Sequence, residues 1–274
     1  MKQKWFIFIL LITGFSQLFA QYEFMQTGLF IDFNTDTNII FSAPNRVVYQ
    51  NHEQNITRTG IYGIDHEHGV PFLNLRWEDG RSERYLMLIG EEFMLLYSDN
   101  TTPTMVLNWL IRDHGMRTGP HITIMRSITA TSFLSENNLN YEATPERLGV
   151  HINRVWAVDG GIGERLYITL PIQSGGSLFI SSGYVHFSRP YLFHYNTRPK
   201  KIRIRSAHDE TQFFDMELRD TPNFQTISLW RYFPEIGWIN FGEDGKVIIE
   251  ILEIFPGTRY NHMCINSILG MWSQ

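Results

Sequence analysis

One short segment combines residue types that bind metal ions. Asp65-His66-Glu67-His68-Gly69 brings two imidazoles and two carboxylates together, and both suit zinc. In an extended chain His66 and His68 would lie on the same side. However, the spacing supplies no clear further ligand, and a polar segment that ends in glycine between two strand-like stretches is typical of a hairpin turn. We therefore predict a turn here and no metal site.

A second segment, Gly160-Gly161-Ile162-Gly163-Glu164, has the composition of a phosphate-binding loop. Such loops hold phosphate at the N-terminus of a helix, whereas this one is followed by the strand-like stretch Arg165–Leu170. We predict a hairpin instead, and no nucleotide cofactor. The chain also shows no Ser-His-Asp order, nucleophile elbow or recognisable carboxylate pair, so we predict a protein without catalytic residues and without cofactors.

The segment Tyr184–Asn196 is the richest in side chains that could bind a polar ligand. Aromatic rings cover apolar faces of a ligand, and planar polar groups bind its hydroxyls. The candidate ligand-binding residues are Arg189, Tyr191, His194, Tyr195 and Asn196. Two structural alternatives stand beside this hypothesis. Phe187, Phe193 and Trp156 could plug the end of the sandwich. Asn196 and Arg198 could fix the loop by bonding backbone groups.

The elements that must position these residues are strands. Between residues 22 and 100, short stretches of β-branched and aromatic residues follow one another closely, and Glu78-Asp79-Gly80-Arg81 supplies a hairpin turn. This spacing predicts a small antiparallel β-barrel or meander. Residues 101–120 break this spacing, and we expect a linker there. Within them, Met105–Ile111 could be a short helical turn or a strand, whereas residues 112–120 are polar, with two glycines and a proline.

Residues 121–274 contain about eight strand-like stretches separated by longer loops, the number typical of a jelly-roll β-sandwich. No long helix is apparent, so the predicted fold class is all-β. In the last connection, Pro256 fixes its own φ and Gly257 accepts a positive φ, which predicts a tight turn before a final strand. Cys264 falls in that strand, where we expect a small buried side chain.

Four motifs in the second half occur together in one order. They are Ile128-Thr129-Ala130-Thr131-Ser132, Trp156 followed by Gly161-Ile162-Gly163-Glu164, Asn196-Thr197-Arg198-Pro199-Lys200-Lys201-Ile202, and Ile254-Phe255-Pro256-Gly257-Thr258-Arg259-Tyr260-Asn261. With them, the chain resembles the bacterial NADase-type glycan-binding domains, which are discoidin-like and have a galactose-binding-like fold. One loop departs from the family pattern, because Gly149-Val150 replaces its Asp-Gly.

The resemblance implies a carbohydrate-binding, non-catalytic protein. The family takes its name from a toxin in which such a domain accompanies a separate NAD-glycohydrolase domain, and residues 22–100 show no match to that enzyme. Two alternatives remain. One is a cell-envelope or secreted adhesion protein whose sandwich binds a cell-surface protein. The other is a hydrolase in the barrel interior, which would require two close carboxylates there.

Composition and the N-terminal residues limit the possible partners and location. A formal net charge of −5 in 274 residues gives no basic footprint for nucleic acid. Residues 1–20 have a lysine-containing start, an apolar run and a small residue at Ala20, which predicts a signal peptide. We therefore expect export to the periplasm, cell envelope or medium, with no membrane span in the mature chain.

Overall fold

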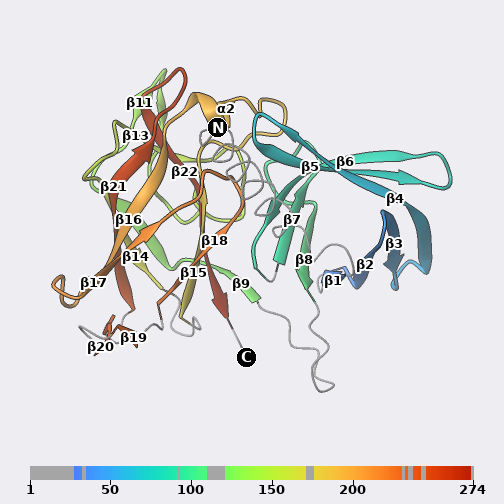
Figure 1. Cartoon of the computed structure of the whole chain (residues 1–274), viewed down its shortest axis with the longest axis horizontal. Helices are drawn as coiled ribbons and strands as arrows, with labels where there is room; N and C mark the ends of the chain where they lie inside the picture. The colour runs from blue at the N-terminus through green and yellow to red at the C-terminus, as the bar shows by residue number, and fades with distance from the viewer. Residues whose placement is uncertain are drawn as a thin grey trace, which may run out of the picture.

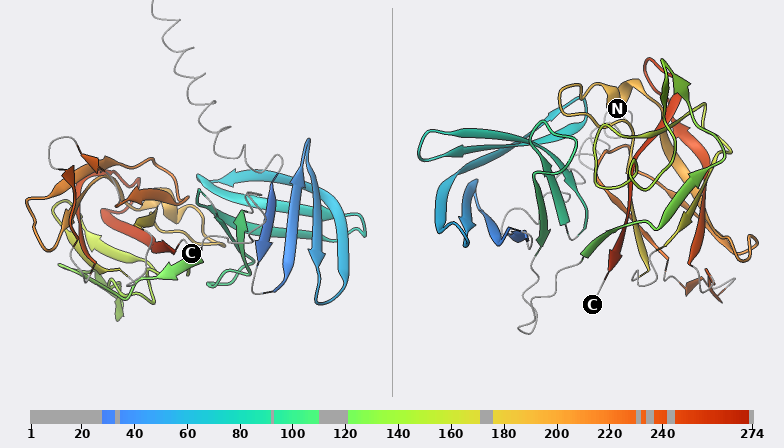
Figure 2. Two further views of the ribbon diagram at one scale, coloured as in Figure 1. Left: turned by 90° about the horizontal axis from the view of Figure 1, so that it is seen from below. Right: turned by 180° about the vertical axis from the view of Figure 1, so that it is seen from behind.

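The computed structural model describes residues 28–32, 35–91, 93–109, 121–170, 176–229, 232–233, 237–241 and 245–272. The predicted signal peptide and residues 110–120 of the predicted linker lie outside these ranges. The regular secondary structure of the described chain is almost entirely β, as predicted, and its helix α2 (Leu192–Tyr195) is a single turn. Among the described residues, no helix is long and apolar enough to cross a membrane. Figures 1 and 2 show a barrel beside a second β-rich body.

The barrel predicted for the first half is confirmed: eight antiparallel strands close on themselves, with β1 paired to both β2 and β8. The strands are β1 (Leu29–Asp32), β2 (Thr37–Ser42), β3 (Arg46–Asn51), β4 (Ile56–Glu67), β5 (Val70–Trp77), β6 (Ser82–Ile89), β7 (Phe93–Tyr97) and β8 (Met105–Trp109). Strand β8 lies within the segment expected to be a linker. The barrel therefore extends beyond residue 100, because closure needs this last strand.

The second body consists of two five-stranded sheets. The first contains β10 (Ser127–Ala130), β14 (Arg165–Thr169), β21 (Lys246–Phe255), β16 (Arg198–Ser206) and β17 (Phe213–Glu217). The second contains β13 (Trp156–Asp159), β22 (His262–Trp272), β15 (Ser177–Ser182) and β18 (Gln225–Ser228), with β9 (His121–Ile124) also paired to β22. Apolar side chains of both sheets, among them Ile168, Ile249, Trp156 and Ile265, share one buried core.

Two small hairpins complete the second body. They are β11 (Ser135–Glu136) with β12 (Leu139–Asn140), and β19 (Tyr232–Phe233) with β20 (Gly237–Trp238). Between β11 and β12, Asn137 and Asn138 have φ values of 50° and 65°. Asparagine tolerates this left-handed conformation, which a two-residue hairpin turn requires.

The structure corrects the prediction for the glycine-rich segment at residues 160–164. Strand β13 pairs with β22 in one sheet, whereas β14 pairs with β10 and β21 in the other. The segment is therefore a crossing between the sheets and not a hairpin. Its glycines at 160, 161 and 163 all have positive φ, which explains the composition without a phosphate. By contrast, the predicted hairpin turn does join β4 to β5, at His68-Gly69. Residues 65–67, which were also expected in the turn, belong to strand β4 and pair with residues 70–72 of β5.

A single apolar core joins the barrel to the second body. Residues on the outer side of the barrel pack against buried residues of the second half, and they belong to one cluster: Val70, Phe72, Leu86, Leu88, Phe93, Leu95 and Tyr97 with Ile152, Phe179, Val185, Phe193, Phe224 and Leu269. Hydrogen bonds cross the same interface. The Tyr97 hydroxyl donates to the Val150 carbonyl at 2.6 Å, and the Phe224 amide donates to the Ile89 carbonyl at 2.8 Å.

We call this shared cluster the joint core, and it explains a pattern in the sequence. Strands β6 and β7 carry the uninterrupted apolar runs 85–89 and 93–97, whose alternate residues would face water in an isolated barrel. Every residue of both runs is buried, because one side faces the barrel interior and the other faces the second body. Strands covered on both faces are apolar at successive positions. The barrel and the two sheets thus share a buried contact.

The connection that contains Pro256 and Gly257 crosses from β21 in one sheet to β22 in the other. Gly257 is not among the residues with positive φ, so the reason for glycine differs from the predicted one. A Cβ atom there would lie 2.3 Å from the Tyr260 carbonyl oxygen and 2.5 Å from that of Tyr195. Glycine is needed because two backbone segments approach each other closely.

Gly257→Ala is expected to lower the free energy of unfolding by about 1–3 kcal/mol, because backbone must move to admit the methyl group. Gly63→Ala is a suitable control, since nothing lies within 4 Å of its Cβ position. Urea denaturation of the two variants measures the difference. Equal midpoints for both variants would contradict the close-approach explanation.

Candidate functional site

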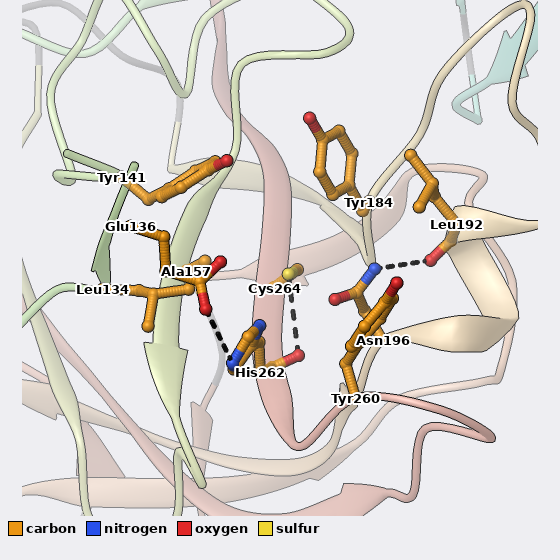
Figure 3. A pocket seen from close by; sticks show the side chains of 10 residues that line it. All are labelled: Leu134, Glu136, Tyr141, Ala157, Tyr184, Leu192, Asn196, Tyr260, His262 and Cys264. Carbon is orange, nitrogen blue, oxygen red and sulfur yellow. Dashed lines mark hydrogen bonds and ion pairs between the residues drawn. The ribbon is translucent and has the colours of Figure 1, made fainter. Parts of the chain in front are cut away.

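Helix α2 and the closing connection are held together by backbone hydrogen bonds. The Thr258 amide donates to the His194 carbonyl at 2.9 Å, and the Tyr260 amide donates to the Tyr195 carbonyl at 2.8 Å. The Asn196 side-chain amide donates to the Leu192 carbonyl at 2.9 Å, which completes the single turn of α2. This arrangement fixes the start of β22 beside α2, and a pocket lies next to it (Figure 3).

The pocket has a volume of about 220 Å³. Its lining comes from the β11–β12 hairpin and the segments beside it, from β13, from the loop after β15, from α2 and from the start of β22. The lining residues are Leu134, Glu136, Tyr141, Ala157, Tyr184, Leu192, Asn196, Tyr260, His262 and Cys264. In Figure 3, Tyr141 and Glu136 lie on one side, Tyr184, Asn196 and Tyr260 lie on the other, and Cys264 lies between them.

Several aromatic rings line the pocket. Tyr260 is 37% exposed, and its ring lies 6.3 Å from that of Tyr195, centroid to centroid. The Tyr260 and His262 rings are nearly parallel, at 5.9 Å and 7°. Tyr141 and Tyr184 are half-buried and pack against the Cys264 cluster. These rings present faces that could cover the apolar side of a flat ligand.

The polar groups of the pocket are mostly uncharged. The Tyr184 hydroxyl donates to Asn153 Oδ1 at 3.1 Å, and burial raises the pKa of this tyrosine, so it stays protonated. Burial also raises the pKa of Cys264, whose thiol lies 3.6 Å from the His262 carbonyl oxygen. Glu136 Oε1 lies 3.6 Å from His262 Nε2. The neutral thiol is no nucleophile, and the predicted buried role of Cys264 is confirmed.

Of the five predicted ligand-binding residues, Asn196 lines this pocket, and the ring of Tyr195 packs against that of Tyr260, which also lines it. Asn196 is only 4% exposed, and its amide nitrogen is occupied by the backbone of α2. The alternative in which Asn196 and Arg198 fix the loop therefore describes what both side chains do. Arg198 Nη1 donates to the Asn196 carbonyl at 2.7 Å.

The other three predicted residues lie elsewhere. The Tyr191 ring packs edge-on against His68 of the barrel at 6.1 Å, and the imidazole of His194 lies against Gly69, where a Cβ would be 2.6 Å from Nε2. Both side chains thus contact the β4–β5 turn. Arg189 Nε donates to His186 Nε2 at 3.0 Å. Phe193 is fully buried in the joint core, in agreement with the structural alternative for the aromatic residues.

Sequence reasoning missed most of the pocket. Glu136, Tyr141, Tyr184, Tyr260 and His262 come from three distant parts of the chain. Two signals were available: Tyr260 stands in a connection where a core aromatic is not expected, and Tyr184 follows a strand directly. Neither signal shows which other residues line the pocket with Tyr184 and Tyr260, because the pocket forms only when the two sheets and the small hairpin come together.

No family model matches the chain. No curated protein matches it either. Nine chains of solved structures are similar to it, and one of these is described as a glycoside hydrolase. That structure shares 8% sequence identity at a TM-score of 0.28, over 89% of this chain and 69% of its own. At such values the similarity supports no statement about fold or activity.

Proposed function

We propose that this protein is an exported, non-catalytic glycan-binding protein whose second half is a discoidin-like β-sandwich, and that the pocket beside α2 receives the sugar. The observation that carries the proposal is the convergence of Tyr141, Tyr184 and Tyr260 from separate segments on one pocket of about 220 Å³. The motif resemblance of residues 128–268 to NADase-type glycan-binding domains supports the same function.

The chemistry of the pocket suits an uncharged sugar. Tyrosine faces can cover the C–H side of a pyranose, and hydroxyl, amide and imidazole groups can exchange hydrogen bonds with its hydroxyls. Among the described residues that line the pocket, only Glu136 carries a carboxylate. Glycoside hydrolysis ordinarily needs two carboxylates. This supports binding rather than cleavage. The affinity per site should be modest, because sugar hydroxyls exchange hydrogen bonds to water for hydrogen bonds to protein with little net gain in free energy.

The test is a glycan array with the mature chain and two matched tyrosine variants. Tyr260→Ala removes a pocket ring that is 37% exposed, whereas Tyr167→Ala removes a ring that is 39% exposed on β14 of the other sheet. We expect Tyr260→Ala to weaken binding about 2- to 10-fold, as the loss of one aromatic contact implies. Tyr167→Ala should bind like the unaltered protein.

A silent array, or equal loss in both variants, would contradict the proposal. If the array is silent and a cell-surface protein is captured by the unaltered chain but not by Tyr260→Ala, the adhesion alternative holds instead. Export has a separate test. The intact mass of protein recovered from the cell envelope or medium should correspond to a chain that begins at Gln21.

A further inference from the structure

An arginine side chain lies beside the pocket next to α2, outside its lining. Arg259 directly precedes Tyr260, which lines the pocket, in the connection between β21 and β22. Its guanidinium carbon lies 5.4 Å from the centroid of the Tyr260 ring and 5.6 Å from that of the Tyr195 ring. The backbone amides of Arg259 and Tyr260 both donate to the Tyr195 carbonyl, at 3.2 and 2.8 Å. These contacts place a positive charge next to the pocket.

The guanidinium of Arg259 has no partner of opposite charge among the described residues. The residue is exposed and forms no ion pair with the described part of the chain. By contrast, the arginines of the first sheet are all paired with carboxylates: Arg165, Arg198, Arg203 and Arg205. A guanidinium presents a planar fork of N–H donors that matches two oxygens of a carboxylate or sulfate group. The fork of Arg259 can therefore bind such a group on a ligand.

Two further arginines lie near Tyr184, on the same side of the pocket as Tyr260 (Figure 3). Arg189 Nη2 lies 2.7 Å from His186 Nε2, and the His186 ring lies 6.5 Å from the Tyr184 ring. Burial raises the pKa of Tyr184, and the positive charges of Arg189 and Arg147 oppose this rise, which requires both to be close to the hydroxyl. Neither arginine forms an ion pair with a described residue.

Acidic groups of the same region, unlike these arginines, have partners within the protein. Glu136, the carboxylate in the pocket lining, lies across the pocket from Tyr260 and 3.6 Å from His262 Nε2 (Figure 3). Other carboxylates accept hydrogen bonds: Glu142 from Asn140 at 3.2 Å, Asp99 from Ser188 at 3.0 Å and Asp159 from Asn261 at 3.4 Å. The side of the pocket that carries Tyr184 and Tyr260 thus has cations nearby whose charge no described carboxylate neutralises by direct contact.

We infer that the glycan bound by this pocket is acidic, and that Arg259 binds its carboxylate or sulfate group. The inference rests on the proposed glycan-binding function. The largely uncharged lining receives a sugar ring, and the anionic group, carried by that ring or by the sugar linked to it, reaches Arg259 outside the pocket. The guanidinium donates two N–H groups to two oxygens of the anion. An acidic glycan is therefore preferred to its neutral counterpart.

A glycan array with matched neutral and acidic probes tests the inference on the mature chain. Lactose is compared with its sialylated and its sulfated derivative, and a chito-oligosaccharide is compared with hyaluronan. Arg259→Gln removes the charge, and Arg259→Lys keeps the charge without the planar fork. Arg46→Gln is the control, because Arg46 is also exposed and without an ion pair among the described residues but stands on β3 of the barrel. Thermal unfolding of each variant checks that it is folded.

We expect the unaltered chain to bind at least one acidic probe about fivefold more tightly than its neutral counterpart, as one exposed ion pair implies. Arg259→Gln should lose this preference and bind the neutral probe unchanged, whereas Arg259→Lys should keep part of it and Arg46→Gln all of it. A preference for the sialylated probe or hyaluronan identifies a carboxylate, and a preference for the sulfated probe identifies a sulfate.

Equal binding of acidic and neutral probes by the unaltered chain would overturn the inference. Equal loss of the preference in Arg259→Gln and Arg46→Gln would also overturn it, because it would reveal general attraction to positive charge. Tyr260→Ala separates this failure from failure of the proposed function. If Tyr260→Ala weakens binding and the unaltered chain shows no acidic preference, the pocket binds glycan and only the role of Arg259 is wrong. If no probe binds to the unaltered chain, both proposals are wrong.

Discussion

Phe93→Ala is expected to lower the free energy of unfolding by about 3–5 kcal/mol, the cost of removing a buried aromatic side chain from a packed core. Phe93 lies at the centre of the joint core and is 1% exposed. Its ring meets Phe179 at 5.1 Å and Phe224 at 5.0 Å, so a barrel residue is packed between two residues of the second half. The substitution would leave a cavity between the barrel and the second body, which both would have to rearrange to fill.

Unfolding of the unaltered chain tests whether the barrel and the two sheets unfold together. Because buried residues of both parts share the joint core, the unaltered chain should unfold in a single cooperative transition when it is measured by both tryptophan fluorescence and circular dichroism. Phe213→Ala is the control, because that ring is 37% exposed on β17 and lies under the guanidinium groups of Arg203 and Arg205. It should lower the free energy of unfolding by about 1–2 kcal/mol, less than Phe93→Ala. Two separate transitions in the unaltered chain would show that the barrel is an independent spacer.

Local patterns in the sequence were sufficient for the class of fold. Close strand spacing and the turn at residues 78–81 predicted the barrel, and these signals act between neighbouring strands of a meander. The glycine segment at 160–164 was wrongly predicted to be a hairpin, because local signals do not determine which strands pair. Positive φ values permit either a hairpin or a crossing between sheets, and only the pairing of β13 and β14 with other strands decides between them.

The candidate site was less predictable because its neighbours are distant in sequence. Tyr191 and His194 have the composition of a ligand-binding loop, yet the β4–β5 turn lies against them. Nothing near residue 191 indicates contact with residues 68–69. The uninterrupted apolar runs of β6 and β7 were the available sign that a barrel face is covered. Such runs reveal that a face is buried but not which loop packs beside it.

Arg198→Ala is expected to lower the free energy of unfolding by about 2–4 kcal/mol and to weaken glycan binding as well. The guanidinium is almost fully buried and forms a two-bond pair with Asp220, at 2.9 and 2.7 Å. Removing one partner of a buried ion pair leaves the other uncompensated. The expected cost is at the lower side of such cases because Asp220 is 33% exposed and can regain water.

The expected loss of glycan binding follows from the hydrogen bonds that Arg198 donates to backbone carbonyls. Its Nη1 donates to the Asn196 carbonyl at 2.7 Å and reaches the Pro256 carbonyl at 3.4 Å, so it ties α2 to the closing connection on which Tyr260 stands. Arg198→Lys keeps the charge but not the two-bond geometry, and an intermediate loss is expected. Urea denaturation and the glycan array together measure both effects.

Arg203→Ala provides the comparison that separates this role from charge alone. Arg203 also forms a two-bond pair, with Asp215 at 2.6 and 3.0 Å, but both side chains are more than a quarter exposed on the outer face of the first sheet. Exposed pairs contribute at most about 1 kcal/mol. Similar destabilisation in the two alanine variants would contradict the argument, because burial and the three backbone carbonyls that Arg198 Nη1 reaches are what distinguish it from Arg203.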